Sequence, residues 1–336
     1  MMPPRFISAA AGLLCLLAAS SVSRADALSE LSDFSVFDNI DLEQLAKGRP
    51  KAVRGAAMSS PRFLSVQICW VVPGTPAQQV EALHRWNPAS HPELNILLHV
   101  SGPDFSRLGD APRNAAVKAL VKATEKLSPK LQMSRAEAAT FAGGASPKER
   151  GIPPAVVTFW SDLLGARYQA FAAGGTAAQS SYDHTGEAIN PGEQVSRLLQ
   201  DQEKIRKQFA PLLDNSGIGR GAGGRPEQFW ELLEIDKKGV LSLGATYGRP
   251  GAGGTFQVAE VSYYASGGYD TALTFHQMWP VTIDGRPFTL VWRGDLISSA
   301  EVANLRGIGR LAAEATFKKD ISKSVGLFLR DTGGNR

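Results

Sequence analysis

The chain has 336 residues, of which 43% are hydrophobic and 20% charged, a balance that excludes a disordered or collagen-like protein. The formal net charge is only +4 and the basic residues are dispersed. A nucleic-acid-binding protein needs a clustered basic face, so we expect no nucleic-acid partner. The length alone would suggest two domains at about 150 residues each.

The first 27 residues are typical of a secretory signal peptide. Arg5 gives a cationic start, residues 6–20 form a short apolar run, and Ala25-Asp-Ala27 has the small residues of a cleavage site. The run is shorter than the ~20 residues that a spanning helix needs, and no later stretch is apolar enough. We expect residues 1–27 to be removed and a periplasmic or secreted chain without a transmembrane segment to remain. Its net charge would be +3, since two arginines and one aspartate are lost.

Residues 28–62 form an N-terminal extension with a short helix predicted over 41–46. The stretch 63–72 alternates apolar and polar side chains, which predicts a strand. The mature chain keeps one cysteine, Cys69, so it has no internal disulfide. No Cys-His-Asn pattern surrounds Cys69, and we interpret it as a small buried residue of this strand rather than a nucleophile.

A helix follows with Thr75 as its N-cap and Pro76 at its first position, and residues 94–100 form a second strand. Residues 105–225 then lack strand alternation and form a helical insertion. Its four predicted helices begin near Ala111, Ser134, Pro153 and Pro191.

The last third is a series of strands followed by one long helix. The strands are predicted over 229–235, 240–247, 256–264, 271–279 and 288–296. The helix starts at the capping box Ser298–Glu301 and runs to about Arg330. Residues 333–336 form a short tail. The apolar side of this helix consists of Val302, Leu305, Ile308, Ala312, Ala315 and Val325, and its solvated side of Arg306, Arg310, Glu314 and Lys318.

Two-residue turns at Gly267-Gly268 and Asp284-Gly285 would fix the strand registers by counting. One face of the sheet then presents an apolar set, which we expect the final helix to cover. The count pairs Leu273 with Ser262 and Phe275 with Glu260. The apolar set is Leu273, Phe275, Trp279, Leu290, Trp292 and Leu296, and the opposite set is Thr274, His276, Met278, Val291, Arg293 and Asp295. A slip of one residue would exchange the faces.

The sequence contains no motif that strongly indicates catalysis. Gly219–Gly224 spells G-x-G-x-x-G, but a helix precedes it and Pro226 follows, so we interpret it as a linker and not a nucleotide loop. No G-x-S-x-G elbow is present. His84, His91 and His99 are too widely spaced for a typical zinc site, and we expect no metal and no cofactor.

The chemically richest positions lie on the predicted strands. Glu260 would project beside Phe275, where burial raises a carboxyl pKa and allows an acid, a base or an anchor for a ligand hydroxyl. Counting also places His276 near Arg293 and Thr274 near Asp295, a cluster that structural charge pairing explains without catalysis.

The order strand, helix, strand, helical segment, five strands and a long last helix resembles the helix-grip arrangement of START and Bet v 1-like proteins. The similarity covers about 63–104 and 227–332, and the helical insertion at 105–225 departs from it. The Trp279–Val281 and Leu290–Asp295 strands are also similar to those of exported bacterial proteins, a likeness that implies no activity.

We therefore expect an α+β fold in which a curved antiparallel sheet of about seven strands grips the C-terminal helix, as one domain over residues 63–332. The helix-grip resemblance implies an apolar cavity and a non-catalytic binding protein for a lipid or other hydrophobic molecule. Its ligand-binding residues would be Glu260, Tyr264, Leu273, Phe275, Trp279 and Trp292. Two alternatives stay open: an envelope protein that docks through the helical insertion, and a hydrolase-type enzyme that uses His276, Asp295 or Glu260. The oligomeric state is open.

Overall fold

The computed structural model describes residues 24–143, 151–219 and 225–333. Within these residues, eight antiparallel strands form one open sheet in the order β1-β2-β8-β7-β6-β5-β4-β3. The strands are β1 Lys51–Arg54, β2 Phe63–Pro73, β3 Ile96–Ser101, β4 Glu227–Ile235, β5 Lys238–Pro250, β6 Phe256–Ala265, β7 Thr271–Ile283 and β8 Arg286–Ser298. The predicted α+β class is confirmed, and β1 adds one strand to the seven that were expected.

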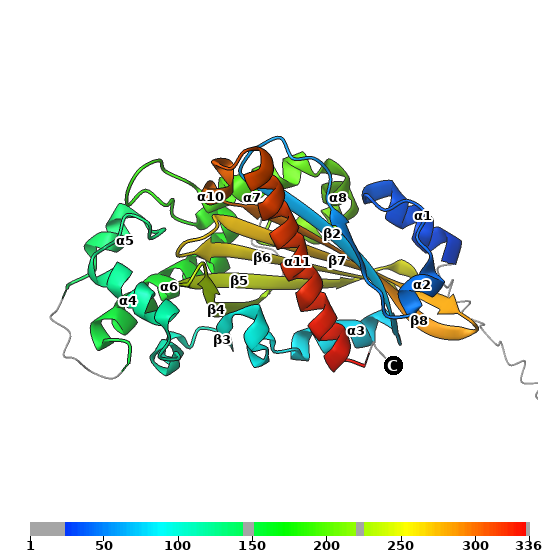
Figure 1. The fold of residues 1–336 in the computed structure, drawn as a ribbon, viewed down its shortest axis with the longest axis horizontal. Coiled ribbons are helices and arrows are strands. Elements are labelled where there is room, and N and C mark those ends of the chain that lie inside the picture. The colour runs from blue at the N-terminus through cyan, green and yellow to red at the C-terminus, as the bar shows by residue number, and fades with distance from the viewer. Residues whose placement is uncertain (1–23, 144–150, 220–224, 334–336) are drawn as a thin grey trace, which may run out of the picture.

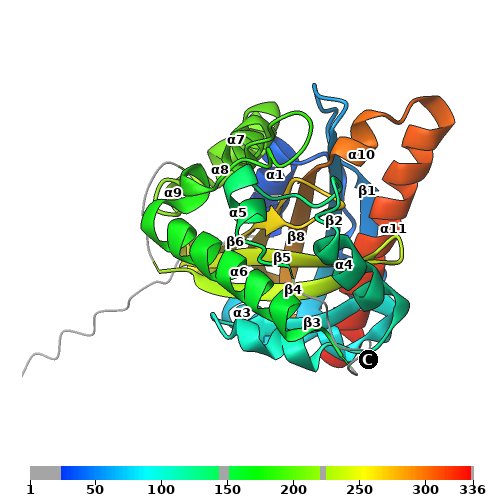
Figure 2. The same cartoon turned by 90° about the vertical axis from the view of Figure 1, so that its left-hand side faces the viewer.

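Helices cover both faces of the sheet and give three layers (Figures 1 and 2). The helices are α1 Arg24–Phe34, α2 Leu42–Ala46, α3 Pro76–Arg85, α4 Ala115–Glu125, α5 Arg135–Ala139, α6 Pro154–Gly174, α7 Pro191–Asp201, α8 Glu203–Gln208, α9 Ala210–Leu213, α10 Ala300–Ala303 and α11 Gly307–Asp331. Helices α6–α9 lie on one side of the sheet, and α11 lies on the other (Figure 2).

The predicted helix N-caps and the predicted Asp284-Gly285 turn are present in the structure. Thr75 and Ser134 each form a capping box with the third residue of the following helix. Asp284 and Gly285 both have positive φ, which is the geometry of a two-residue type I′ turn. This turn pairs Ile283 with Arg286, and the predicted β7–β8 register is confirmed, including His276 opposite Arg293.

The predicted β6–β7 register is wrong by one residue. Leu273 pairs with Val261 and Phe275 with Ala259, so Glu260 lies opposite Thr274. The connection is a five-residue loop between Ala265 and Thr271, longer than the Gly267-Gly268 turn. Buried Asp270 fixes this loop by accepting hydrogen bonds from Arg62, Gln132 and Ser298. The slip moves Glu260 to the other face of the sheet.

The expectation that the final helix covers the apolar face is also wrong. Phe34 of α1 packs against Trp292 with ring centroids 4.7 Å apart, and Phe209 packs against Phe275 at 4.8 Å. The N-terminal helix and the helical segment between β3 and β4 thus bury the apolar set. Because that face is already covered, α11 lies on the opposite face.

Helix α11 is rotated relative to the prediction. Arg310, expected in solvent, donates to the backbone oxygens of Pro61 and Phe63, and Glu314 forms an ion pair with Arg54 at 3.1 Å. Five residues of the expected buried side are instead half-buried or exposed, namely Val302, Leu305, Ile308, Ala312 and Ala315. Only its last turns are buried, through Val325, Leu327, Phe328 and Leu329.

Helix α1 begins within the predicted signal segment 1–27, of which residues 1–23 lie outside the described residues. Ala27 and Leu31 are buried, and Trp279 Nε1 donates to Glu30 Oε2 at 2.8 Å. Within the described ranges, no helix has both the length and the apolar character needed to cross a membrane.

Candidate functional site

A row of polar side chains crosses the α11 side of the sheet. Cross-strand pairing places Thr246, Glu260, Thr274 and Asp295 side by side on β5, β6, β7 and β8. His276 and Arg293 form the adjacent pair. We call these six residues the polar face cluster. In a sheet with one face packed on the core, the alternate residues of each strand that point to the other face are usually polar. What distinguishes this cluster is its burial, since Asp295 and His276 are both buried.

Asp295 and Arg293 form the charged centre of the polar face cluster. Arg293 donates from Nε at 2.8 Å and from Nη2 at 2.7 Å to the Asp295 carboxylate, and Thr274 Oγ1 donates to the same carboxylate at 2.9 Å. The Asp295 side chain is only 4% exposed. A bidentate pair of this kind holds both groups in one geometry.

Glu260 has no such partner. Within the described residues it forms no ion pair, and its carboxylate accepts one long hydrogen bond of 3.4 Å from Thr246 Oγ1. Burial, reinforced by the nearby charge of Glu231, raises the pKa of Glu260 to about 7. Arg293 and His99 counteract part of this shift. Glu260 can therefore exchange a proton near neutral pH.

His276 is the second unsatisfied group. It is 6% exposed, and neither ring nitrogen has a hydrogen-bond partner in the described structure. Trp70 lies against it edge-on, with ring centroids 6.3 Å apart. Burial and the neighbouring charge of Arg293 lower the pKa of His276 well below its ordinary value. The ring is thus neutral at pH 7.

A second polar group lies further along the same face. Glu231 bonds to His99 Nδ1 at 2.8 Å, and although burial alone would lower the pKa of His99, this contact raises it. Ser242, Ser262 and Tyr269 share hydrogen bonds of 2.8–2.9 Å. These groups satisfy one another and leave Glu260 as the unpaired acid between two paired ones.

The predicted ligand-binding residues are divided between the two faces. Leu273, Phe275, Trp279 and Trp292 are at most 1% exposed, and they lie on the side that α1 and the helical segment cover. Tyr264 lies on that side too: its hydroxyl donates to Gln132 O at 3.0 Å, and the Arg167 guanidinium lies 4.4 Å from its ring centroid. Glu260 lies alone on the other side. The structure therefore does not bring the six residues together.

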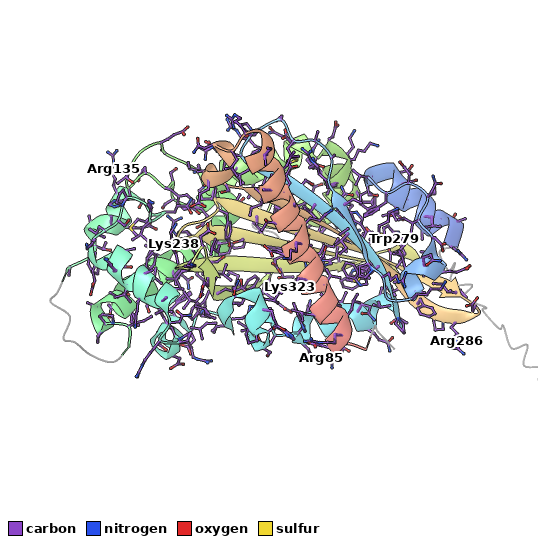
Figure 3. The ribbon with its side chains drawn as sticks, viewed as in Figure 1. Arg85, Arg135, Lys238, Trp279, Arg286 and Lys323 are labelled. Atoms are coloured by element: carbon purple, nitrogen blue, oxygen red, sulfur yellow. The ribbon has the colours of Figure 1, made fainter. Side chains whose placement is uncertain are left out.

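A concave site lies at one end of the sheet, between α4 and the β4–β5 hairpin. This groove has a volume of about 760 Å³, within the range of small-molecule sites. Figure 3 shows Lys238, on this hairpin, far from Trp279 at the other end of the sheet. The apolar lining of the groove includes Ala119, Leu120, Ala123, Leu131, Ile235 and Val240. We call it the lysine-rimmed groove.

Four lysines give the groove its name. Lys122 comes from α4, Lys126 is the C-cap of that helix, Lys130 lies in the segment that follows, and Lys238 lies in β5. All four are exposed. Asp236 and Glu301 are the carboxylates among the lining residues, so cations outnumber anions. The i, i+4 spacing of Lys118, Lys122 and Lys126 is a sequence signal that could have indicated one basic helix face.

The walls of the groove are fixed by main-chain contacts. Gln132 N donates to Ser266 O at 3.0 Å, which ties the segment after α4 to the β6–β7 loop. Leu241 N donates to Ser266 Oγ at 2.9 Å, which ties β5 to the same loop. Asp236 and Lys237 both have positive φ in a two-residue turn. A Cβ on Gly239 would lie 3.0 Å from Ala116 O, so the hairpin packs closely on α4.

The remaining candidate residues from the sequence, the histidines and Cys69, have structural roles. His84 pairs with Glu227 at 3.3 Å and His91 with Asp331 at 2.7 Å. The interpretation of Cys69 as a buried strand residue is confirmed: it is 0% exposed in β2, and burial raises the pKa of its thiol to about 12. The Gly219–Gly224 linker lies almost wholly outside the described residues. In the described ranges, no three ligand-type side chains converge as a metal site would require.

Comparison with known proteins adds no further assignment. No family model matches the chain, and none of the curated proteins or solved structures compared is similar to it. Function must therefore be argued from the groove and from the polar face cluster.

Proposed function

We propose that the chain is an exported, non-catalytic binding protein for a small molecule with an apolar body and an anionic group. The lysine-rimmed groove supports this proposal, because it combines a volume of about 760 Å³ with an apolar floor and four exposed lysines. The apolar body would displace water from the half-buried side chains of Ala119, Ala123 and Ile235, and the anion would lie among the lysine ammonium groups. The site is thus different from the six residues predicted on the strands.

Isothermal titration calorimetry with dodecanoate and with dodecanol tests the proposal. The two probes share one chain and differ in charge. We expect dodecanoate to bind and dodecanol to bind several-fold more weakly, with the difference shrinking at high salt because exposed charges are screened. Equal affinity for the two probes would contradict the anionic part of the proposal, and no binding of either would reject it.

Three variants test where and how the ligand binds. Ala123→Trp places an indole in the groove and should abolish binding, whereas Ala166→Trp on exposed α6 surface should not change it. Lys126→Gln should weaken dodecanoate binding and leave dodecanol binding unchanged. If Ala123→Trp binds dodecanoate as tightly as the unmodified chain, the ligand lies elsewhere.

The polar face cluster favours a second candidate function, hydrolysis with Glu260 as general base. Glu260, His276 and Asp295 share one face of the sheet, and Glu260 is unpaired with a pKa of about 7. Its carboxylate would take a proton from water as the water oxygen attacks an ester carbonyl. Turnover of a p-nitrophenyl ester that rises with pH through 7, and that Glu260→Gln removes, would support this function. Absence of turnover, or equal rates in the two proteins, would reject it.

A further inference from the structure

Helix α11 presents an apolar stripe to solvent. Ile308 is 86% exposed and Leu311 is 60% exposed, and with Val36 they are the exposed large hydrophobic residues among those described. Ala312 and Ala315 are also exposed and follow at helical spacing on the same side. We call Ile308, Leu311, Ala312 and Ala315 the outer stripe. Single exposed apolar residues are ordinary, but a contiguous stripe marks a contact surface.

Polar contacts hold α11 in this orientation. On the opposite side of the helix, Arg310 donates to two backbone oxygens of the segment that enters β2. Glu314 lies between Arg54 at 3.1 Å and Arg310 at 3.2 Å, and its side chain is only 13% exposed. Rotating the outer stripe inward would break both Arg310 hydrogen bonds to the backbone and the Glu314–Arg54 ion pair. The contacts that hold α11 against the rest of the protein therefore keep the outer stripe exposed.

Helix α11 also lies in a position that is accessible to a flat surface such as a bilayer. Figure 2 shows α11 along the outer edge of the molecule beside β1, with its N-terminal part projecting away from the sheet. Exposed cations lie beside the stripe: Arg306 precedes it, and Lys318 and Lys319 follow it. Between residues 306 and 320 the exposed carboxylate is Asp320. An apolar stripe flanked by basic residues is the pattern of helices that lie in a membrane interface.

We propose that the outer stripe of α11 docks onto an anionic lipid bilayer surface. Ile308 and Leu311 would insert below the headgroups, while Lys318 and Lys319 would contact lipid phosphates. A second copy of the chain fits the stripe less well, because a stable dimer buries about 800 Å² per partner and the stripe has two large side chains. This proposal does not depend on a ligand in the lysine-rimmed groove.

Co-sedimentation of the full chain with vesicles tests the proposal. The vesicles are pure phosphatidylcholine, or an equal mixture of phosphatidylcholine and phosphatidylglycerol. We expect binding to the mixed vesicles that falls as salt is raised, and at least a tenfold loss of partitioning in the pair Ile308→Ser and Leu311→Ser. Val36→Ser is the matched control, because it removes the third exposed large side chain, and it should bind like the unmodified protein.

A second pair of substitutions distinguishes the contribution of the lysine charges from that of the inserted apolar side chains. Lys318→Gln with Lys319→Gln should weaken binding to the mixed vesicles only, whereas Lys204→Gln with Lys207→Gln on exposed α8 surface should have no effect. Circular dichroism confirms that each variant is folded. Equal vesicle binding by the serine pair would overturn the proposal. So would a dimer in size-exclusion chromatography that the serine pair dissociates in the absence of any vesicle binding.

Discussion

Replacing Glu260 with glutamine should stabilise the protein at pH 8 but not at pH 4. In the folded chain the pKa of Glu260 is raised from 4.5 to about 7, chiefly by burial and next by the charge of Glu231. Each unit corresponds to 1.36 kcal/mol, so ionised Glu260 costs the folded state about 3 kcal/mol at most. Partial exposure of the side chain to water reduces this value. Glutamine resembles the protonated acid and removes the cost.

The folded and unfolded chains bind different numbers of protons at Glu260, and this difference sets how the free energy of unfolding changes with pH. Between pH 4.5 and pH 7 the folded chain keeps a proton on Glu260 that the unfolded chain has already released. Stability therefore falls as pH rises through this window and stays low above it. The charged groups that face Glu260 are Glu231, Arg293, His99 and Asp295, and all four remain in the variant. Their own titrations largely cancel when the two proteins are compared at one pH.

Urea unfolding at several pH values between 4 and 8 measures the effect, as the difference in unfolding free energy between Glu260→Gln and the unmodified chain. Glu81→Gln is the control, since Glu81 is 72% exposed and makes only a surface pair with Arg85. Its difference should stay constant within about 0.5 kcal/mol. A Glu260→Gln difference that is equally constant across the range would refute the reasoning.

Three further outcomes follow from the packing and are measured by the same urea unfolding. Glu30→Ala should cost about 1–3 kcal/mol, because it leaves the buried Trp279 indole N–H unpaired; an unchanged midpoint would show that α1 is not anchored there. Gly294→Ala should cost about 1–3 kcal/mol, because its Cβ would lie 2.5 Å from the Trp292 ring; a neutral result would contradict this close approach. His276→Leu should gain stability relative to the unmodified chain as pH falls below 6.5, because a buried neutral imidazole resists protonation; a difference independent of pH would contradict it.

Most of the elements could be predicted from local signals. The strand and helix ranges follow from periodicity, and the starts of α3, α5 and α6 follow from a cap or a proline. The β7–β8 register was predictable because Asp284-Gly285 strongly favours one turn geometry. The β6–β7 register was not, since its loop is set by distant partners of Asp270, and the sequence cannot show that Arg62 and Gln132 meet there.

That one register decides which residues share a site. With the correct pairing, Glu260 joins Thr274, Asp295 and Arg293, and the alternative that named Glu260, His276 and Asp295 for catalysis becomes geometrically consistent. With the slipped pairing, Glu260 would have been an isolated acid among buried aromatic rings. Burial periodicity alone cannot tell these cases apart, because both place Glu260 on a half-buried strand.

The position of α11 has a cause that lies outside its own sequence. An apolar sheet face must be covered, and any helix with enough apolar residues can cover it. Here the segment between β3 and β4 and helix α1 supply Phe209 and Phe34, which leaves the opposite face for α11. On that face the last turns of α11 pack Phe328 and Leu329 into an apolar cluster that includes Trp70 and Val291. The first turns of α11 lie instead beside β1 and the segment that enters β2, where Arg310 and Glu314 make polar contacts and Ile308 is left exposed. The exposed stripe on α11 is thus a consequence of which element covered the apolar face.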